Sequence, residues 1–311
     1  IKVKLESSAT SGVPSTVLLD KITARRQIRA MARVMQDVLG SQRRPLCVMD
    51  IDPSSSNAVN LGARGTAIKG YLNFASKAHY FIDAESKNTP LVFLQQQFAD
   101  FLNQAENGEP LIIFGFTFVL YHNVFLQLKQ QNYKFKLPTG TKVIHIGGWK
   151  KLESEKVSKK KFNQDIADVL GIGEQNIVDI YGFTEQMGLN YPDCTHGWKH
   201  VHAYSEVIIR DESDLSLCKD GQQGLLQFIS PLQHSYPGNV ALTDDLGVLR
   251  NDTCDCGRVG KRFQVIGRAK KAEVRGCGDI MSDKFARSSP PKLSGCVSPA
   301  NSKLIVYHSP V

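Results

Sequence analysis

The residues best suited to chemistry lie in the segment Tyr181-Gly182-Phe183-Thr184-Glu185, which follows an apolar strand predicted over residues 176–180. The strand end can place an aromatic ring, a hydroxyl and a carboxylate around one small volume. A nucleotide site uses these groups for the base, for a phosphate and for Mg²⁺. Taken alone, such a segment is more often an ordinary strand-to-loop turn with a surface glutamate. The nucleotide interpretation therefore depends on further phosphate- and ribose-binding signals elsewhere in the chain.

Three other segments carry matching chemistry. Residues 6–16 are rich in Ser, Thr and Gly, and such loops hold phosphates through hydroxyls and backbone N–H groups, although flexible linkers share this composition. Residues 242–247 are predicted to form a tight strand turn whose carboxylates grip a ribose diol. Gly267 and Arg268 offer a hinge and a cation for ribose or phosphate. Each segment alone is more often a solvated turn, so only the ordered set favours a nucleotide site.

The pattern of apolar segments indicates the elements that position these residues. Strands are predicted at residues 46–51, 80–82, 111–116, 141–146 and 176–180. Helices are predicted at residues 23–39, 65–76, 119–129 and 158–170, and from residue 89 to near Gly108. This alternation is typical of an α/β fold with a largely parallel sheet, where ligands bind at the carboxyl ends of strands. After residue 190 the predicted strands are shorter (205–210, 224–230 and 265–266), which indicates a smaller, distorted β subdomain.

The composition argues against a nucleic-acid-binding, a membrane-spanning or a secreted protein. The chain has 311 residues, 41% of them hydrophobic, and a net charge of +8. The lysines do not form a contiguous basic face with interleaved aromatics, so a nucleic-acid partner is not expected. No apolar run reaches the roughly 18 residues of a membrane span. No signal peptide is visible, and the odd count of seven cysteines favours a reducing cytoplasm in which cysteine serves metal binding or chemistry.

Taken in order, these segments resemble the adenylate-forming superfamily, and most closely the LuxE-type acyl-protein synthetases of bacterial fatty-acid reductase complexes. The closer resemblance covers about residues 5–283 and rests on residues 6–12, 114–118, 147–151, 181–186, 199–201 with 207–211, and 275–278. It implies an adenylate-forming large domain with mostly parallel sheets, a smaller β subdomain and only a vestigial C-terminal domain. Residues 1–190 would be the nucleotide- and acyl-binding region, 191–268 the β-rich subdomain, and 269–311 a short flexible segment.

The resemblance also implies an enzyme that uses ATP and Mg²⁺ to convert a carboxylic acid, expected to be a long-chain fatty acid, to acyl-AMP. The implied positions are Ser8, Thr10, Ser11 and Gly12 over the β- and γ-phosphates; Gly147, Gly148 and Trp149 beside the adenosine; Tyr181, followed by Gly182, stacked on the adenine; Thr184 at the α-phosphate; Glu185 on Mg²⁺; and Asp245 with Arg268 at the ribose. Two positions depart from the family pattern, because Ala9 and Asp244 stand where glycine is usual. The lysine that neutralises the α-phosphate stays open, with Lys150 and Lys151 as candidates.

The cysteines divide into two groups. Cys254 and Cys256, with Cys194 and His200 upstream, offer four ligands for tetrahedral Zn²⁺; His202 is an alternative to His200, and unliganded thiols are about as common an outcome. Cys277 lies between glycines beside Arg275, which could lower its pKa. By resemblance, Cys277 would accept the acyl group and pass it to a partner acyl reductase or acyltransferase. Two alternatives remain open: an acyl- or aryl-CoA ligase, and a non-catalytic nucleotide-binding subunit of an acyl-transfer complex.

Overall fold

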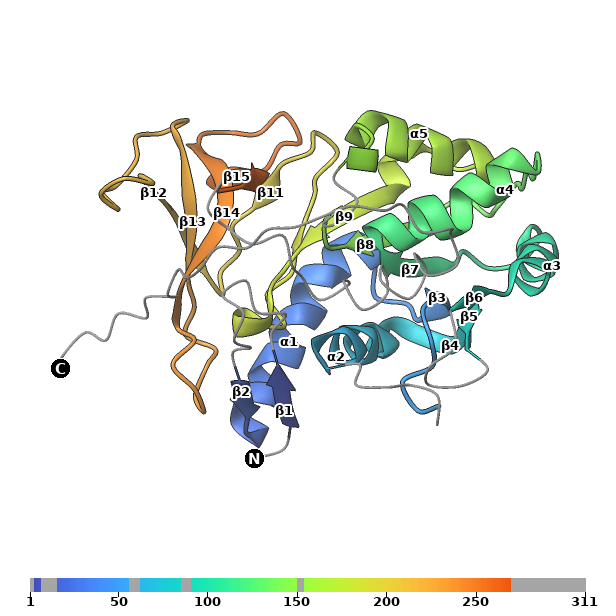
Figure 1. Ribbon diagram of the computed structural model, residues 1–311, viewed down its shortest axis with the longest axis horizontal. Coiled ribbons are helices and arrows are strands. Elements are labelled where there is room, and N and C mark those ends of the chain that lie inside the picture. Colours follow the sequence, from blue (N-terminus) through green and yellow to red (C-terminus); the bar gives the residue numbers. More distant parts are fainter. Residues whose placement is uncertain (1–2, 7–15, 56–61, 85–90, 150–153, 270–311) are drawn as a thin grey trace, which may run out of the picture.

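The computed structural model describes residues 3–6, 16–55, 62–84, 91–149 and 154–269 (Figure 1). The helices are α1 (Lys21–Leu39), α2 (Gly62–Tyr71), α3 (Gln95–Ala105), the π-helix Val119–Phe125, α4 (Leu126–Gln130) and α5 (Lys159–Leu170), with 3₁₀ turns at Leu72–Phe74, Glu174–Asn176 and Thr184–Gln186. The predicted phosphate-loop residues Ser8, Thr10, Ser11 and Gly12, the candidate lysines Lys150 and Lys151, and Cys277 lie outside the described residues. None of the described helices is long and apolar enough to cross a membrane.

A six-stranded sheet forms the first half of the chain, in the order β10-β9-β8-β7-β3-β4. Its strands are β3 (Arg44–Met49), β4 (Ala75–Tyr80), β7 (Ile112–Phe116), β8 (Lys142–Ile146), β9 (Ile177–Tyr181) and β10 (Tyr191–Pro192). All neighbours are parallel except β10, which pairs antiparallel with β9. The α/β fold with a mostly parallel sheet is therefore confirmed.

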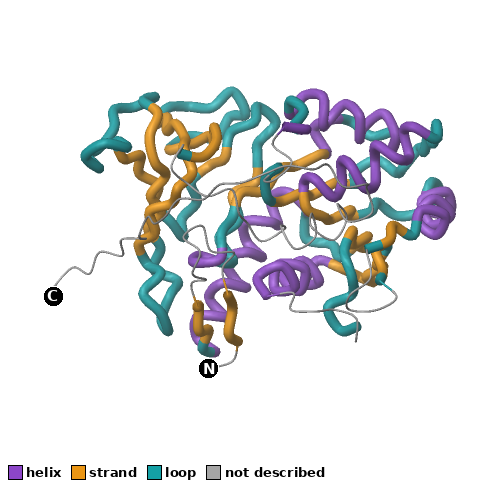
Figure 2. The backbone as a smooth tube through the Cα atoms, viewed as in Figure 1, coloured by secondary structure: helices purple, strands orange, loops and turns teal. Residues whose placement is uncertain are grey.

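Helices cover both faces of this sheet (Figure 2). Successive side chains of a strand point to opposite faces, so both positions of a covered strand must be apolar. In β3, Leu46 and Val48 pack with Met35 of α1 on one face. Cys47 and Met49 belong to the core on the other face, which contains residues of α3, α4 and α5. The helices cover the two faces of the sheet, so polar side chains can gather at the carboxyl ends of its strands.

The second half forms a five-stranded antiparallel sheet in the order β11-β15-β14-β13-β12. Its strands are β11 (Lys199–His200), β12 (Glu206–Arg210), β13 (Gln223–Ile229), β14 (Val240–Asn251) and β15 (Lys261–Arg268). Its core includes Leu226, Phe228 and Phe263, joined by Ala30 of α1 and by Tyr191. This is the expected β-rich region, although the expected division of the chain into domains at residue 190 stays a prediction.

Four local predictions were wrong. The helix predicted at residues 65–76 ends at Tyr71, and the strand predicted at residues 80–82 is replaced by β4, which ends at Tyr80. Residues 242–247 are not a tight turn, because they lie within β14 and pair with β13 and β15 through two register shifts. Extended polar residues can read as a turn when a bulge interrupts the alternation. The helix predicted from residue 89 begins at Gln95, because Val92–Phe93 forms β6, which pairs with β5 (Ile82–Asp83). The remaining strands, β1 (Val3–Glu6) and β2 (Thr16–Leu19), form an antiparallel pair on either side of residues 7–15.

Candidate active site

Tyr181, Asp245 and Arg268 meet where the six-stranded sheet adjoins the β-rich half. Tyr181 is the last residue of β9, and its hydroxyl donates a hydrogen bond of 2.7 Å to Oδ2 of Asp245 in β14. Asp245 lies directly opposite Arg268 of β15, whose Nε donates to Oδ1 over 3.1 Å. Three residues that were assigned to adenine and ribose from the sequence therefore form one contact group.

The environment of Tyr181 keeps its hydroxyl protonated. Burial, followed by the negative charge of Asp245, raises the pKa of Tyr181 well above its usual value. The ring is stacked on Phe228, with centroids 5.5 Å apart and planes inclined by 23°. One face of the ring is thus supported by the core of the β sheet, while its hydroxyl holds the carboxylate of Asp245.

Thr184 and Glu185 form a single 3₁₀ turn immediately after β9. Two side chains fix this turn to the segment around residue 238. Gln186 donates from Nε2 to the carbonyl oxygen of Gly238 over 2.9 Å, and the hydroxyl of Tyr236 donates to the carbonyl oxygen of Glu185 over 2.7 Å. A Cβ at Gly238 would lie 2.7 Å from that same Glu185 oxygen, so the close approach requires glycine. Burial raises the pKa of the Glu185 carboxyl, because the ionised form loses hydration there.

Ser235 and His234, which directly precede Tyr236, contact the start of α1. Ser235 donates from Oγ to the carbonyl oxygen of Leu18 over 2.7 Å and accepts from the backbone N–H of Asp20. Asp20 is the N-cap of α1, and its Oδ2 lies 2.8 Å from Nδ1 of His234. The segment Gln233–Tyr236 therefore joins the end of β2, which follows the predicted phosphate loop, to the turn that carries Glu185.

The glycine pair after β8 is held by Thr117. The Thr117 hydroxyl donates to the carbonyl oxygen of Gly147 and lies 2.9 Å from Nδ1 of His145. Gly147 has φ +84°, a value that other residues rarely adopt. Burial lowers the pKa of His145 to about 4, despite the opposing charge of Asp179, so this imidazole is neutral at pH 7.

Trp149 is packed among aromatic side chains rather than exposed at the surface. Its side chain is only 8% exposed, and its ring meets those of Tyr121 and Phe162 edge-on, with centroids 5.4 and 6.2 Å apart. Tyr121 lies in the π-helix, a form that is frequent at functional sites. The contact of Gly147, Gly148 and Trp149 with adenosine stays a prediction.

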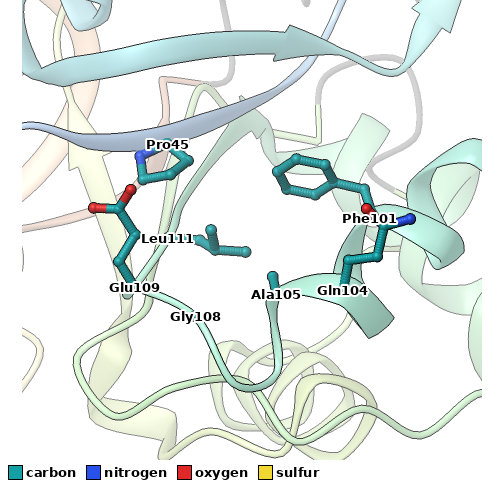
Figure 3. A pocket seen from close by; sticks show the side chains of 7 residues that line it. All are labelled: Pro45, Phe101, Gln104, Ala105, Gly108, Glu109 and Leu111. Atoms are coloured by element: carbon teal, nitrogen blue, oxygen red, sulfur yellow. The ribbon is translucent and has the colours of Figure 1, made fainter.

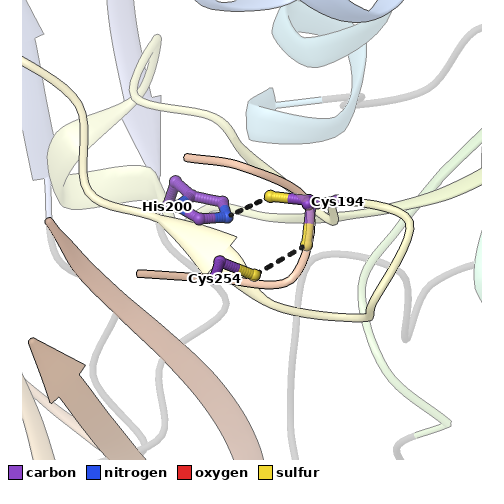
Figure 4. Close-up of side chains that lie close together, drawn as sticks. Cys194, His200 and Cys254 are labelled. Carbon is purple, nitrogen blue, oxygen red and sulfur yellow. Dashed lines mark hydrogen bonds between the residues drawn. The ribbon is translucent and has the colours of Figure 1, made fainter. Parts of the chain in front are cut away.

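A cysteine and histidine cluster lies in the turns beside β11 and β15. The Sγ atoms of Cys194, Cys254 and Cys256 and a ring nitrogen of His200 all lie within 4.8 Å of one another, and Figure 4 shows three of these side chains pointing at a common centre. Cys194 Sγ and Cys254 Sγ are 3.9 Å apart, and Cys256 Sγ is 3.3 Å from His200 Nε2. The four residues predicted as zinc ligands are thus brought together.

Two matching turns build this cluster. Gly197 N–H donates to the carbonyl oxygen of Cys194, and Gly257 N–H donates to that of Cys254 in the same way. Both glycines have positive φ, +74° and +85°. His202, the alternative ligand, is placed elsewhere, because its ring is stacked on Tyr191 at 4.7 Å.

Buried charges connect the cluster to β9. Lys199 donates from Nζ to the carbonyl oxygen of Asp179 over 3.0 Å and to Oδ1 of Asp193 over 2.9 Å. Burial would raise the pKa of Asp179, but Lys199, His145 and Lys159 outweigh it and the pKa falls to about 2. Lys159 also pairs with Asp193. Asp179 lies two residues before Tyr181, so this network anchors the strand that carries Tyr181.

Comparison with known proteins decides the family. The family described as acyl-protein synthetase, LuxE, matches residues 1–286. This chain belongs to the LuxE acyl-protein synthetase family. The chain is 22% identical over 286 residues to a long-chain-fatty-acid–luciferin-component ligase of Vibrio harveyi, covering 92% of this chain and 72% of that protein. A ligase of the same description from Aliivibrio fischeri is 20% identical, covering 91% and 72%.

Solved structures place this LuxE-family chain in the adenylate-forming fold. A 2-hydroxyisobutyryl-CoA ligase in complex with 2-HIB-AMP and CoA aligns with TM-score 0.61 and 18% identity, covering 87% of this chain and 58% of that one. ATP-bound MatB from Rhodopseudomonas palustris aligns with TM-score 0.55 and 12% identity, covering 85% and 47%. The chain thus spans about half the length of these ligases. The adenylate-forming fold predicted from the sequence is confirmed.

The positioning residues of this LuxE-family site were not visible in the sequence. Gln186, Thr117, Tyr236 and Ser235 hold backbone carbonyl groups from segments far away along the chain. The one available signal was Pro237-Gly238-Asn239, a turn between two strands that indicates close backbone approach.

A pocket elsewhere lies away from these residues. It is lined by Pro45, Phe101, Gln104, Ala105, Gly108, Glu109 and Leu111 (Figure 3). Pro45 lies near the start of β3 and Leu111 precedes β7, so the pocket is at the amino ends of the parallel strands. Tyr181 and the Gly147 loop lie at the carboxyl ends, so the pocket is at the opposite end of the sheet from them.

Proposed function

We propose that this chain activates a carboxylic acid with ATP and transfers the acyl group to a thiol. The observation that carries the proposal is the contact group of Tyr181, Asp245 and Arg268 beside the turn of Thr184 and Glu185. An aromatic face, a carboxylate and a cation at one strand end fit a nucleoside, and a threonine and a glutamate follow within four residues. The LuxE family and its ligase relatives support the acyl part of the assignment.

The chemistry has two steps. A carboxylate oxygen of the acid attacks the α-phosphorus of ATP, and the bond from that phosphorus to the bridging oxygen breaks. Pyrophosphate then leaves with the electron pair, and acyl-AMP remains. A thiolate next attacks the acyl carbon, the bond to the phosphate oxygen breaks, and AMP leaves. We assign the thiolate to Cys277, which lies outside the described residues, and the final delivery to an acyl reductase or acyltransferase partner.

In the proposal, the described residues position ATP and neutralise its phosphate charge, and none of them forms a covalent bond with the substrate. In the proposal, Asp245 accepts hydrogen bonds from the ribose hydroxyls, with Arg268 beside it, and Thr184 donates to the α-phosphate. Glu185 would hold Mg²⁺, which supplies charge neutralisation on the phosphates. Tyr236 and Gln186 fix the backbone of that turn, so that its side chains need not be reoriented when ATP binds.

A structural zinc ion is the second part of the proposal. Sulfur ligands at about 2.3 Å from tetrahedral zinc lie about 3.8 Å apart. The distance of 3.9 Å between Cys194 Sγ and Cys254 Sγ fits this geometry. Three cysteines and His200 complete four protein ligands, which leaves no open position for catalysis. The ion would cross-link the two glycine turns and support Lys199, next to His200, in its contact with Asp179.

The proposed function is tested by isotope exchange and by mass. With ATP, Mg²⁺ and a panel of carboxylic acids, we expect acid-dependent exchange of pyrophosphate into ATP. Intact mass after the reaction should increase by one acyl group, and this adduct should be absent in Cys277→Ser while exchange persists. Equal labelling of Cys277→Ser would contradict the carrier role. Rapid formation of CoA thioesters by Cys277→Ala would favour a CoA ligase, and ATP binding without exchange would favour a non-catalytic subunit.

A further inference from the structure

The exposed face of α1 is strongly basic. Residues 21–36 contain five cationic side chains and no acidic one, and all five are exposed: Lys21, Arg25, Arg26, Arg29 and Arg33. Two exposed isoleucines lie among them, with Ile22 37% and Ile28 50% exposed. We call this set of seven residues the arginine face.

The seven residues share one side of the helix. At 100° per residue, the five cations fall within an arc of about 140° and a length of about 18 Å. The opposite side is packed, with Ala30, Met31 and Met35 in the cores of the two sheets and Thr23 and Gln27 buried beside them. Figure 1 shows α1 at the centre of the molecule, between α2 and the β-rich half.

The cations of the arginine face have no acidic partner among the described residues. The nearest acid along the helix, Asp37, lies 3.8 Å from Arg258 and outside the cationic run. By contrast, most cations near the cysteine cluster and α5 are paired, as in Lys199 with Asp193 and Lys161 with Asp165. The basic charge is thus left available to a partner from outside these segments.

This arrangement opposes helix stability. Lys21, Arg25, Arg29 and Arg33 repeat at i, i+4, where like charges repel. Lys21, Arg25 and Arg26 also lie in the first two turns, where the helix dipole disfavours positive charge, and the first turn has no acidic residue to compensate beyond the N-cap Asp20. Alanine or glutamate would suit the fold better at these positions. The arginines are therefore better explained by an interaction than by folding.

We propose that the arginine face docks an acidic surface of a partner protein. Arginine forms bidentate pairs with carboxylates and is enriched at protein interfaces, and exposed isoleucines add apolar contact between the charges. A second copy of the chain is disfavoured, because the chain has net charge +8. Residues 270–311 are disfavoured for the same reason, with seven Lys or Arg and three Asp or Glu.

Two other anionic partners fit less well. An interfacial membrane helix needs a free apolar face, whereas the apolar face of α1 is already buried in the cores. A nucleic-acid surface usually interleaves aromatic side chains with cations, and α1 has no aromatic residue. The acidic protein surface is the partner that uses both the arginines and the isoleucines.

The N-terminus of α1 joins the arginine face to the segment that holds the candidate active site. Asp20, the N-cap of α1, contacts His234 and Ser235, and the adjacent Tyr236 holds the Glu185 carbonyl. The segment that leads to Glu185 contacts α1 through Thr23 and Gln27, on the side opposite the arginine face, so a protein docked on that face would be separated from the turn of Thr184 and Glu185 by the helix itself. A role for that protein in receiving or delivering the acyl group rests on the proposed function, whereas the docking itself does not.

The docking is tested with a labelled helical peptide whose glutamates are spaced i, i+4, i+8, measured by fluorescence anisotropy at low and at physiological salt. A peptide of the same composition with scrambled spacing is the control ligand. We expect Arg25→Glu/Arg29→Glu/Arg33→Glu to weaken binding of the spaced peptide by on the order of tenfold or more. The matched variant Lys69→Glu/Lys77→Glu/Lys219→Glu, with the same change of charge at exposed positions, should bind within about twofold of the unmodified chain.

Two kinds of result would overturn the docking proposal. Equal binding of the scrambled peptide, or an equal loss in the matched variant, would reduce the effect to net charge and overturn the proposal. Tighter binding to phosphatidylserine vesicles or to duplex DNA than to the peptide would assign the face to a membrane or to nucleic acid.

A second variant separates docking from folding. Arg25→Ala/Arg29→Ala/Arg33→Ala should keep or raise the Tm, and should leave pyrophosphate exchange unchanged while peptide binding is lost. A lowered Tm would show that the arginines stabilise the fold and would remove the argument for docking. Failure of the proposed function would appear differently, as absent exchange in the unmodified chain.

Discussion

The hydroxyl of Tyr181 and the carboxylate of Asp245 are joined by a hydrogen bond of 2.7 Å across 64 residues of sequence. This contact links the end of β9 in the parallel sheet to the middle of β14 in the antiparallel sheet. The other oxygen of Asp245 accepts from Arg268, so both carboxylate oxygens are oriented by side-chain hydrogen bonds. The first prediction concerns what that carboxylate does.

Asp245→Asn should weaken ATP binding. The amide retains one acceptor oxygen but loses the charge, so the proposed hydrogen bonds to the ribose hydroxyls would lose about 1.5–3 kcal/mol. The KM for ATP in pyrophosphate exchange should rise by about 10- to 100-fold, with a smaller change in kcat. Tyr181→Phe is the matched comparison, because it keeps the ring and removes only the hydrogen bond to Asp245. An unchanged KM in Asp245→Asn would remove the residue from the nucleotide site.

The Tyr236 hydroxyl is predicted to position Glu185 through its backbone. Tyr236→Phe removes the 2.7 Å hydrogen bond to the Glu185 carbonyl while the ring remains. We expect a loss in kcat of about three- to tenfold and a higher Mg²⁺ requirement, since the turn becomes free to shift. The KM for the acid should not change.

A control tyrosine distinguishes this role from a general loss of stability. Tyr133→Phe alters a ring stacked on Phe135, on the opposite side of the parallel sheet from α1. Its kcat and Mg²⁺ requirement should match those of the unmodified chain. Equal Mg²⁺ requirements in Tyr236→Phe and Tyr133→Phe would contradict the positioning role.

The sequence was informative wherever function depends on side-chain type within a short segment. Tyr181, Asp245 and Arg268 each lie in such a segment, and the apolar runs of β3, β7 and β8 indicated a covered parallel sheet. The contacts of Tyr236, Gln186 and Thr117 could not be anticipated, because each holds a backbone carbonyl brought close only by folding. The position of Asp245 inside β14 was also missed, since the register shifts there interrupt the period of two that marks a strand.

The ionised carboxylate of Glu185 is predicted to lower the free energy of unfolding, although activity requires it. Burial raises its folded-state pKa above the ordinary value of 4.5. The folded state thus binds a proton more tightly than the unfolded state, and the free energy of unfolding falls as pH rises through the interval between the two pKa values. This cost is fully present once the pH lies above the folded-state pKa. Glu185→Gln should therefore raise the Tm in that range and have little effect at pH values well below 4.5, as measured by thermal unfolding across pH, while adenylation is abolished.

The same raised pKa predicts an acidic limit to activity that depends on Mg²⁺. Protons and the metal compete for the ionised carboxylate, so higher Mg²⁺ should shift the acidic limb of the exchange rate to lower pH. The measurement is the pH profile of pyrophosphate exchange at several Mg²⁺ concentrations. A limb that does not move with Mg²⁺ would assign the titration to another group.

The last prediction concerns zinc at Cys194, His200, Cys254 and Cys256. Purified protein should contain one zinc per chain by elemental mass spectrometry, and Cys254→Ser or His200→Asn should lose it. Because four protein ligands cross-link two turns, removal by a chelator should lower the Tm by several degrees without blocking ATP binding outright. His202→Gln and Cys218→Ser are the controls, since His202 is stacked on Tyr191 and Cys218 lies outside the cluster. Retention of zinc in Cys254→Ser together with its loss in His202→Gln would reassign the ligands.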